Sequence, residues 1–468
     1  MAKTLFEKIW SDHTIASLSD GVALVLVDRI LLHERTGGVA LKSLAEAGRV
    51  VAAPRQTFVT MDHVVDTLPG RGDRTQMPTG TAFITETRAA ARAAGLTLFD
   101  LGDPRQGIVH VISPEQGIVL PGLTLVCPDS HTCTQGALGA LAWGIGSTEA
   151  EHALCTRTLR VKRPRTMLVR IDGELAPGVT AKDLALHIIA RHGAAGGAGH
   201  IVEYGGEAIT AMDLEARMTL CNMATEFSAF SAIIAPDEKT FAYLRGRAFA
   251  PAGDAWDEAM HQWATLRSDN GAEYDRVIHV DAAEVAPMMT WGTNPQLAIP
   301  IDGTVPGQDA SGTDAEAYDR AMTYMGLTAG SRLQGLAIDG AFIGSCTNSR
   351  ISDLRRAADL LRGRHVAHGV RAICVPGSSA VKAAAEAEGL DRVFRAAGFE
   401  WRESGCSMCF FAGGESFGPQ ERVVTSTNRN FESRQGPGTR SHLASPEVVA
   451  ASAIAGRIAD PRAAGATR

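Results

Sequence analysis

Three of the eight cysteines stand where thiolates could hold a metal. Cys346 lies in a polar turn between a predicted strand and a predicted helix, and Cys406 and Cys409 form a C-x-x-C pair. Loops at strand ends commonly present ligands. Three cysteines suggest an iron–sulfur cluster in which one iron lacks a cysteine ligand and can act on substrate oxygen as a Lewis acid. Spacing alone leaves open the alternative that Cys346 is merely a small buried residue and that Cys406 and Cys409 have this spacing by chance.

Two short segments place a carboxylate beside an imidazole: Asp62 precedes His63, and Asp129 lies two residues before His131. A carboxylate fixes the tautomer of a histidine and raises its basicity, which a general acid or base requires. Residues 136–146 predict the start of a helix rich in small residues, whose N-terminus would favour an anion. Each acid–histidine segment taken alone is more typical of a surface turn.

Other residues could bind or orient an acidic substrate. His110 ends a short apolar run and could pair with a distant carboxylate. Asn222 and Glu226 are spaced to share one face of a predicted helix. Residues 402–440 contain five arginines and no lysine, and the arginine fork binds carboxylates bidentately. This segment suits a di- or tricarboxylate, with a solvated face as the alternative.

Alternating strands and helices must position these side chains. Strands are predicted at 166–171, 336–338, 341–344 and 372–375, and helices at 181–192, 350–361 and from 379 through 385. Thr180 is placed to cap the first of these helices, with Asp183 three residues further on. Strands that alternate with helices in this way predict an α/β fold.

Length and composition exclude several classes of protein. The chain has 468 residues, enough for about three domains. Hydrophobic residues make up 45% and charged residues 21%, which argues against a disordered chain. A net charge of −7 argues against a nucleic-acid partner. The longest apolar run, residues 22–27, is too short to span a membrane, and the N-terminus has no signal-peptide core, so we expect a cytoplasmic protein.

Three motifs occur in order: G-S-C-T-N-S at 344–349, G-C-S-M-C at 405–409 and N-R-N-F at 428–431. Together they give the chain a resemblance to the aconitase superfamily over nearly its whole length. The resemblance implies three aconitase-type α/β/α domains packed around an iron–sulfur cluster, without the fourth (swivel) domain. We expect these domains at 1–165, 166–301 and 317–468, with a linker at 302–316.

The resemblance also implies a role for each candidate residue. Cys346, Cys406 and Cys409 would hold one [4Fe–4S] cluster with one iron not ligated by cysteine, and the other five cysteines would be buried small residues. Asp62–His63 resembles the pair that handles the leaving hydroxyl, and Asp129–His131 resembles a second pair. His110 and Glu226 resemble a further coupled pair. The positions similar to those around the cluster and the substrate carboxylates are Asn222, Asn428, Arg429 and Arg434.

The implied activity is that of a hydro-lyase which isomerises a 2-hydroxy dicarboxylic acid by dehydration and rehydration. Within the superfamily the chain is most similar to the branch that converts 2-isopropylmalate to 3-isopropylmalate in leucine biosynthesis. A separate small subunit would supply the swivel domain and the catalytic base, in a heterodimer.

Departures from the family pattern leave alternatives open. Residues 33–38 read H-E-R-T-G-G where relatives have H-E-x-T-S-P, and Pro128 replaces a glycine. A paralogue acting on citramalate and mesaconate, or on homocitrate and homoaconitate, is therefore a second hypothesis. An RNA-binding relative without a cluster is disfavoured by the net charge and the retained cysteines. A thiol redox protein using only Cys406 and Cys409 is the remaining alternative.

Overall fold

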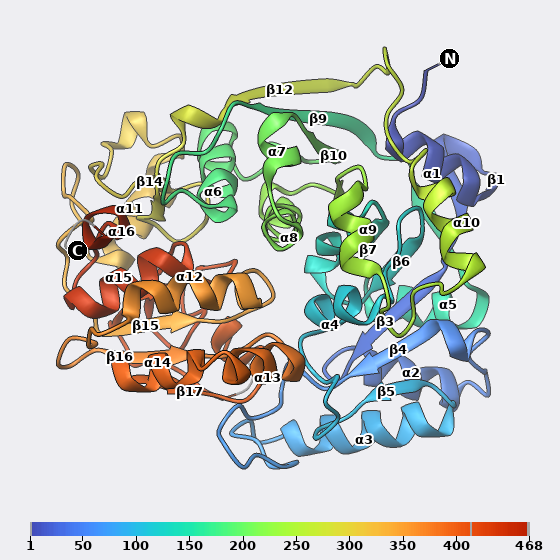
Figure 1. Ribbon diagram of the computed structural model, residues 1–468, viewed down its shortest axis with the longest axis horizontal. Coiled ribbons are helices and arrows are strands. Elements are labelled where there is room, and N and C mark those ends of the chain that lie inside the picture. The colour runs from blue at the N-terminus through green and yellow to red at the C-terminus, as the bar shows by residue number, and fades with distance from the viewer. Residues whose placement is uncertain (1, 412–413, 466–468) are drawn as a thin grey trace. The chain divides into compact units, whose positions relative to one another are not determined.

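The structure, a computed structural model, describes residues 2–411 and 414–465. Three of its sheets are parallel, and helices alternate with their strands (Figure 1). The first has the order β5 (Thr97–Phe99), β4 (Thr57–Thr60), β3 (Arg29–His33), β6 (Thr124–Cys127) and β7 (Leu141–Gly144). The second has the order β11 (Ser231–Ile233), β10 (His200–Gly205), β9 (Arg165–Asp172) and β12 (Arg276–Asp281). The third has the order β17 (Phe399–Trp401), β16 (Arg371–Cys374), β15 (Gly340–Ile343), β18 (Arg422–Thr425) and β19 (Arg440–Leu443).

Antiparallel pairing joins β1 (Thr14–Ser17), β2 (Val22–Leu26) and β8 (Thr158–Lys162), and also β13 (Met288–Thr290) and β14 (Ala298–Pro300). The α-helices are α1 (Leu5–His13), α2 (Gly37–Glu46), α3 (Gly80–Ala93), α4 (Val109–Gln116), α5 (Ser147–Thr156), α6 (Ala181–His192), α7 (Glu207–Ala211), α8 (Leu214–Met223), α9 (Glu238–Leu244), α10 (Asp254–Trp263), α11 (Ala315–Met325), α12 (Ile351–Leu361), α13 (Ser379–Ala387), α14 (Leu390–Ala397), α15 (Pro446–Ala455) and α16 (Pro461–Gly465). Short 3-10 helices include η3 (Ser130–Leu138), η4 (Ala224–Phe227) and η7 (Ser407–Cys409).

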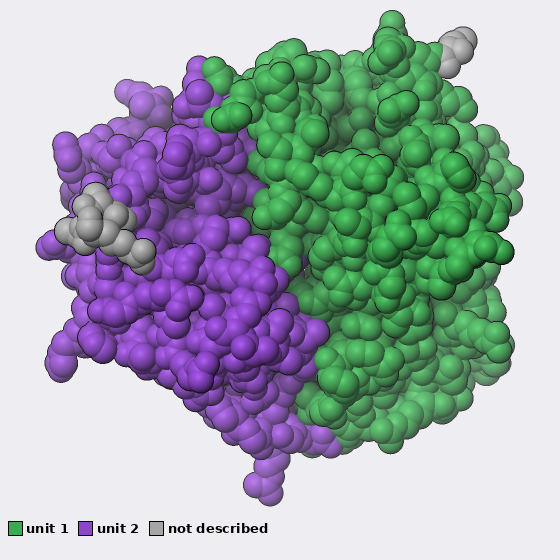
Figure 2. Space-filling model, in the orientation of Figure 1, with its two compact units in different colours: residues 1–63, 81–174, 197–281 green, residues 64–80, 175–196, 282–468 purple. Residues whose placement is uncertain are grey.

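The chain divides into two compact units (Figure 2). Unit 1 comprises residues 1–63, 81–174 and 197–281 and holds the first two parallel sheets. Unit 2 comprises residues 64–80, 175–196 and 282–468 and holds the third. The three parallel sheets thus follow the three ranges predicted as domains, except that β9 begins one residue before the second range, and the boundaries themselves stay a prediction. No helix among the described residues is long and apolar enough to cross a membrane.

Most of the predicted elements are present. β9 covers the strand predicted at 166–171, and α6 covers 181–192. The cap of α6 is the predicted one, because the Thr180 side chain accepts from the Asp183 backbone and the Asp183 carboxylate accepts from the Thr180 backbone. α12 and β16 lie within one residue of their predicted ranges.

Two predicted elements are wrong. Residues 336–338 form no strand, and Ala337 makes only an isolated bridge with Arg457. Residues 136–146 do not start a helix, because η3 ends at Leu138 and β7 follows. A Cβ on Gly136 would lie 1.8 Å from the Ala232 carbonyl oxygen, and one on Gly144 would lie 2.5 Å from the Asp129 carbonyl oxygen. The small residues therefore permit close backbone approach, and the prediction of an anion site at a helix N-terminus here is wrong.

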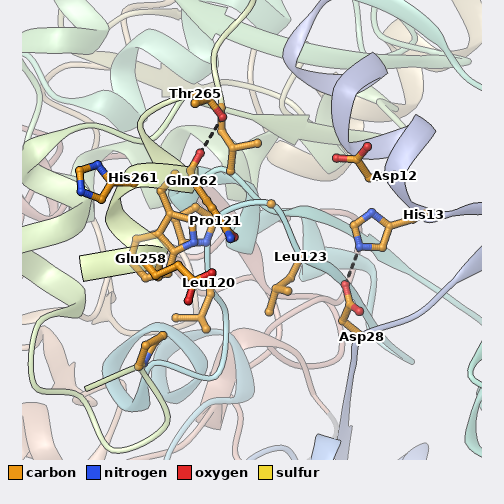
Figure 3. A pocket seen from close by; sticks show the side chains of 15 residues that line it. Asp12, His13, Asp28, Leu120, Pro121, Leu123, Glu258, His261, Gln262 and Thr265 are labelled. Atoms are coloured by element: carbon orange, nitrogen blue, oxygen red, sulfur yellow. Dashed lines mark hydrogen bonds and ion pairs between the residues drawn. The ribbon is translucent and has the colours of Figure 1, made fainter. Parts of the chain in front are cut away.

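An ion pair in unit 1 links the end of α1 to the first sheet. His13 Nδ1 donates to the Ile9 carbonyl over 2.7 Å, and its Nε2 donates to Asp28 Oδ2 over 2.7 Å. The pair lies beside an open pocket lined also by Asp12 and Leu123 (Figure 3). Burial lowers the pKa of His13, but the bonds to Asp28 and Ile9 outweigh it and leave the pKa raised. The pKa of Asp28 is lowered, chiefly by His13 and Thr124 against the opposing effect of burial.

This pair predicts a pH window for stability. A raised histidine pKa stabilises the fold at low pH, and the contribution is lost as pH rises through that pKa; a lowered aspartate pKa acts in the opposite sense. The contribution should therefore be largest from about pH 4.5 to 6 and decline on either side. We expect His13→Gln to lower the free energy of unfolding by about 1 kcal/mol at pH 5.5 and by much less at pH 9. Urea unfolding at both pH values measures this, and an equal loss at both would contradict it.

Candidate functional site

In unit 1 the candidate acids and histidines gather at one edge of the first sheet. β4, β3 and β6 are neighbouring parallel strands, so their carboxyl ends meet at that edge (Figure 1). Asp62 and His63 follow β4, Glu34 follows β3 and Asp129 follows β6. Ligands of open parallel sheets bind at such edges.

Asp129 is the centre of this group. Its Oδ1 accepts from His110 Nε2 over 2.9 Å, and its Oδ2 lies 3.3 Å from His63 Nε2. The other ring nitrogen of His63 bonds to Asp62 Oδ1 over 2.6 Å. His110 enters the group from α4 and is buried, as are Asp62 and His63. The expectation that His110 pairs with a distant carboxylate is confirmed, and that carboxylate is Asp129.

The second pairing differs from the expectation. His131 Nε2 bonds to Glu226 Oε1 over 2.9 Å, so Glu226 couples to His131 and the expected pairing with His110 is wrong. The link from His131 to Asp129 runs mainly through the backbone, since His131 N donates to Asp129 Oδ1 over 2.8 Å while Nδ1 is 3.7 Å away. His110 points to Asp129 because α4 begins directly beside the Asp62 carboxylate, which accepts from Val109 N over 2.8 Å.

Asn222 and Glu226 do not share a helical face. α8 ends at Met223, and Glu226 lies in the 3-10 helix η4 that follows. Asn222 Nδ2 donates to Thr134 Oγ1 in η3 over 2.8 Å, within a fully buried contact. The two side chains therefore have different partners, because Glu226 bonds to His131 and Asn222 bonds to Thr134.

Sequence reasoning missed two members of the group, His33 and Glu34. The Glu34 carboxylate accepts from the backbone N–H groups of Asp62 over 3.0 Å and His63 over 2.7 Å. The His33 ring stacks on the His63 ring with centroids 4.0 Å apart. The signal was available, because His33 ends β3 and Glu34 follows it, just as Asp62 and His63 follow β4.

Burial and charge set distinct protonation states at this edge. The pKa of His63 is lowered by burial but raised more by Asp62 and Asp129, and lies well above its usual value. Burial raises the pKa of Asp129, yet bonds from His110, His131 and His63 hold it well below its usual range. Burial and the neighbouring His63 lower the pKa of His33 to about 4. At neutral pH the group thus holds a cationic His63 that can give up a proton and a neutral His33.

By residue type, His33, Glu34, Asp62 and His63 could also hold a metal, since one ligand atom of each lies within 4.8 Å of the others. Both Glu34 oxygens, however, already accept backbone N–H groups, and Asp62 accepts from His63 and Val109. We therefore interpret these four residues as a hydrogen-bonded acid–base group.

In unit 2 the candidate cysteines lie in two strained turns. Cys346 follows β15, and the preceding Ser345 has a φ of 83°. Ser407, between Cys406 and Cys409, has a φ of 46°. Backbone strain of this kind persists only where the surrounding structure enforces it, and it is concentrated at functional sites.

Buried groups enforce the second turn. Met408 is fully buried in a core that includes Phe342 and Ile373 from β15 and β16. The Ser407 hydroxyl donates to the Glu415 carboxylate, which also accepts from Thr67 Oγ1 over 3.1 Å. Met408 and Ser407 therefore fix the loop between the two cysteines from both sides.

Asn428 and Arg434 lie against the thiols. Asn428 Nδ2 donates to Cys346 Sγ over 3.4 Å, and its Oδ1 is 3.9 Å from Cys409 Sγ. Arg434 Nη2 donates to Cys409 Sγ over 3.8 Å. The backbone before Asn428 is held by the buried ammonium of Lys182, which donates to the Ser426 and Thr427 carbonyls. Arg429, the next residue, is half-buried.

The residues of unit 2 fit an iron–sulfur cluster. Cys346, Cys406 and Cys409 are each at most 5% exposed. N–H donors lie beside two of these thiols, and Arg434 Nε is buried without a hydrogen-bond partner among the described residues. Buried thiolates surrounded by N–H donors are the ordinary environment of such clusters.

The other five cysteines and three of the five arginines serve the fold. Burial raises the pKa of the Cys133 thiol to about 11 and raises those of Cys127, Cys221 and Cys374 well above their usual value, while Cys155 is half-buried. No disulfide joins any of the eight cysteines, all of which are described. Arg402 binds Glu400 and Glu415, and Arg422 and Arg440 donate to the Met325 and Tyr324 carbonyls at the end of α11. Only Arg429 and Arg434 remain as candidates for a substrate carboxylate in this segment.

A family model described as the aconitase family (aconitate hydratase) matches residues 7–456. The chain belongs to the aconitase family. Enzymes of this family bind an iron–sulfur cluster. The family assignment agrees with the α/β fold of parallel sheets described above.

Two relatives match over nearly the full length of both chains. The 3-isopropylmalate dehydratase large subunit of Roseiflexus castenholzii is 51% identical over 99% of this chain and 99% of its own. The 3-isopropylmalate dehydratase large subunit 1 of Bradyrhizobium diazoefficiens is 50% identical over 98% of this chain and 96% of its own. Among solved structures, aconitase X of Thermococcus kodakaraensis aligns over 87% of this chain and 84% of its own, with a TM-score of 0.47 and 14% identity.

Proposed function

We propose that this chain is the large subunit of an enzyme that isomerises 2-isopropylmalate to 3-isopropylmalate by dehydration and rehydration in leucine biosynthesis. The observation that carries the proposal is the identity of about one residue in two, over nearly the whole chain, with two dehydratase large subunits. The acid–base group of unit 1 and the thiols of unit 2 supply the residue types that this reaction needs.

The cofactor proposed is one [4Fe–4S] cluster, held by Cys346, Cys406 and Cys409, with one iron not ligated by cysteine. When bound, such a cluster supplies Lewis acidity toward a substrate oxygen. Asn428 and Arg434 lie at hydrogen-bond distance from the ligating sulfurs and would steady them. Arg429 is the residue proposed to bind a substrate carboxylate through its planar fork.

The acid–base group performs the proton transfers in this proposal. Loss of hydroxide from the substrate requires a proton, and His63 carries one because Asp62 and Asp129 stabilise its cation. Removal of the proton from the neighbouring carbon requires a base, which we assign to the small subunit. The two losses leave a cis-alkene diacid and water, and addition of water in the opposite sense gives the isomer. Asp129 orients His63 and His110, and Glu226 orients His131.

Dependence on a small subunit is the direct test of this proposal. The purified chain, with its cluster rebuilt anaerobically, is expected to show no turnover of 2-isopropylmalate alone and full turnover after addition of the small subunit. The ultraviolet absorbance of the unsaturated intermediate follows the reaction. Full activity of the chain by itself would refute the two-subunit proposal, and inactivity of the reconstituted pair on every 2-hydroxy diacid would refute the function.

The same assay distinguishes the alternative substrates. The departure at residues 37–38 concerns packing: a Cβ on Gly37 would lie 2.6 Å from Leu32 Cβ, and one on Gly38 would lie 2.0 Å from Thr87 Oγ1. These glycines let α2 begin close to β3 and α3, so this departure gives no support for a different substrate. A preference for citramalate or homocitrate in the assay would support the paralogue hypothesis instead.

A further inference from the structure

The Arg434 guanidinium packs against two aromatic rings. It lies 4.8 Å from the centroid of Phe410 and 4.9 Å from that of Phe431. Its backbone is also fixed, because Arg434 N donates to the Phe431 carbonyl over 3.0 Å and its carbonyl accepts from Phe411 N over 2.8 Å. A cation over an aromatic face is attracted by the ring electrons. Rings and backbone together restrict the guanidinium to one position.

In that position the guanidinium contacts Cys409, one of the three proposed cluster ligands. Nη2 donates to Cys409 Sγ over 3.8 Å, while Nε has no hydrogen-bond partner among the described residues although Arg434 is only 9% exposed. Leaving a buried donor unpaired costs about 1–3 kcal/mol. An arginine placed to bind a substrate carboxylate alone would have no need to contact a cysteine sulfur. Nε, the unpaired donor of the guanidinium that contacts Cys409 through Nη2, is thus available to an acceptor of the group bound by the cysteines.

We propose that Arg434 is a positioning residue for the iron–sulfur cluster: clamped by Phe410 and Phe431, it donates to Cys409 and retains the metal group in the chain. This inference rests on the cluster in the proposed function and adds a role to the carboxylate binding expected from the sequence. N–H donors and positive charge next to a cluster sulfur stabilise the ligating thiolate and raise the reduction potential.

The test is the rate at which the rebuilt cluster is lost to an iron chelator, without substrate and under anaerobic conditions. We expect Arg434→Gln to lose its visible absorbance about 10-fold faster than the wild-type chain, since partners of metal ligands are worth about 10–100-fold in affinity. Arg434→Lys should be intermediate, because lysine keeps the charge and loses the fork. The reduction potential of Arg434→Gln should also shift to a more negative value.

The aromatic clamp offers a matched pair of variants. Phe431 is 51% exposed and Phe411 is 44% exposed, so a leucine at either position leaves the core intact. Of these two residues, Phe431 contacts the guanidinium with its ring, whereas Phe411 contacts Arg434 through its backbone N–H. We expect Phe431→Leu to accelerate cluster loss a few-fold and Phe411→Leu to match the wild type. The thermal midpoint of each chain without its cluster checks that the variants fold.

The outcomes separate this inference from the proposed function. If Arg434→Gln loses its cluster at the wild-type rate and only raises KM for the diacid, Arg434 binds substrate alone and the inference is wrong. Equal rates of cluster loss for the Phe431 and Phe411 variants would show that the Phe431 ring does not contribute to this role of Arg434. If the wild-type chain takes up no cluster at all, the proposed function itself fails.

Discussion

Replacing Cys346 with serine is expected to abolish both the iron–sulfur absorbance and the turnover of the enzyme reconstituted with its small subunit. The Cys346 thiol is 4% exposed, follows β15 through the strained Ser345 and lies 3.4 Å from the Asn428 amide. A serine oxygen is a harder ligand than thiolate and suits an iron–sulfur cluster poorly. We expect turnover to fall by at least about 1,000-fold, because the proposed chemistry depends on the Lewis acidity that the cluster would supply.

The matched control is Cys374→Ser, a second buried cysteine in the same sheet. Cys374 ends β16, the strand that pairs with β15, and burial raises the pKa of its thiol well above the usual value. This variant should keep its cluster and its turnover, with some loss of stability from a buried hydroxyl. Iron per chain and visible absorbance measure the first effect. A thiol redox protein using Cys406 and Cys409 alone would give the opposite result, since Cys346→Ser would then leave its activity intact.

Replacing Asp129 with asparagine is the second large effect that we expect. One carboxylate orients His110 and stabilises the His63 cation, and asparagine retains the shape without the charge. General acid–base catalysis contributes about 100- to 10,000-fold, so we expect kcat to fall within that range with little change in cluster content. Removing the charge also breaks the ion pair between Asp129 and the buried His63 cation, which keeps only Asp62, and this costs about 3 kcal/mol of unfolding free energy.

Asp28→Asn provides the comparison, because Asp28 also pairs with a histidine in unit 1. It binds His13 at the end of α1 and takes no part in the acid–base group, so it should lose stability and keep kcat. Steady-state kinetics and urea unfolding of both variants separate the two roles. An Asp129→Asn enzyme with wild-type kcat would show that the group is structural.

Short-range patterns were sufficient for the α/β class and for several elements of the fold. Thr180 and Asp183 predict the start of α6 because a capping box depends on residues three apart. The helix predicted at residues 136–146 was wrong, because the small residue at Gly136 is required by the Ala232 carbonyl, almost a hundred positions away in the sequence. Local propensity has no access to such a constraint.

The candidate site shows the same division. His110 and Asp129 are 19 residues apart, and His131 and Glu226 are 95 apart, so their types were evident while their pairing was not. The missed His33 and Glu34 are adjacent, but there the histidine precedes the acid, which reverses the order of the two predicted acid–histidine segments. They join the group only because β3 lies between β4 and β6.

By itself the sequence determined which chemistry the chain can perform, because thiolates, acid–histidine segments and an arginine-rich loop are properties of residue type and spacing. It determined the α/β class as well, since alternation of strand and helix is local. Only the tertiary structure decided which partners meet. The fold brings Cys346 and Asn428 together across 82 residues and places Arg434 beside Cys409. It also makes Arg422 and Arg440 donate to carbonyls at the end of α11. The reason is physical: hydrogen bonds and charge pairs act over a few ångströms, and the order of parallel strands determines which distant residues come within that range.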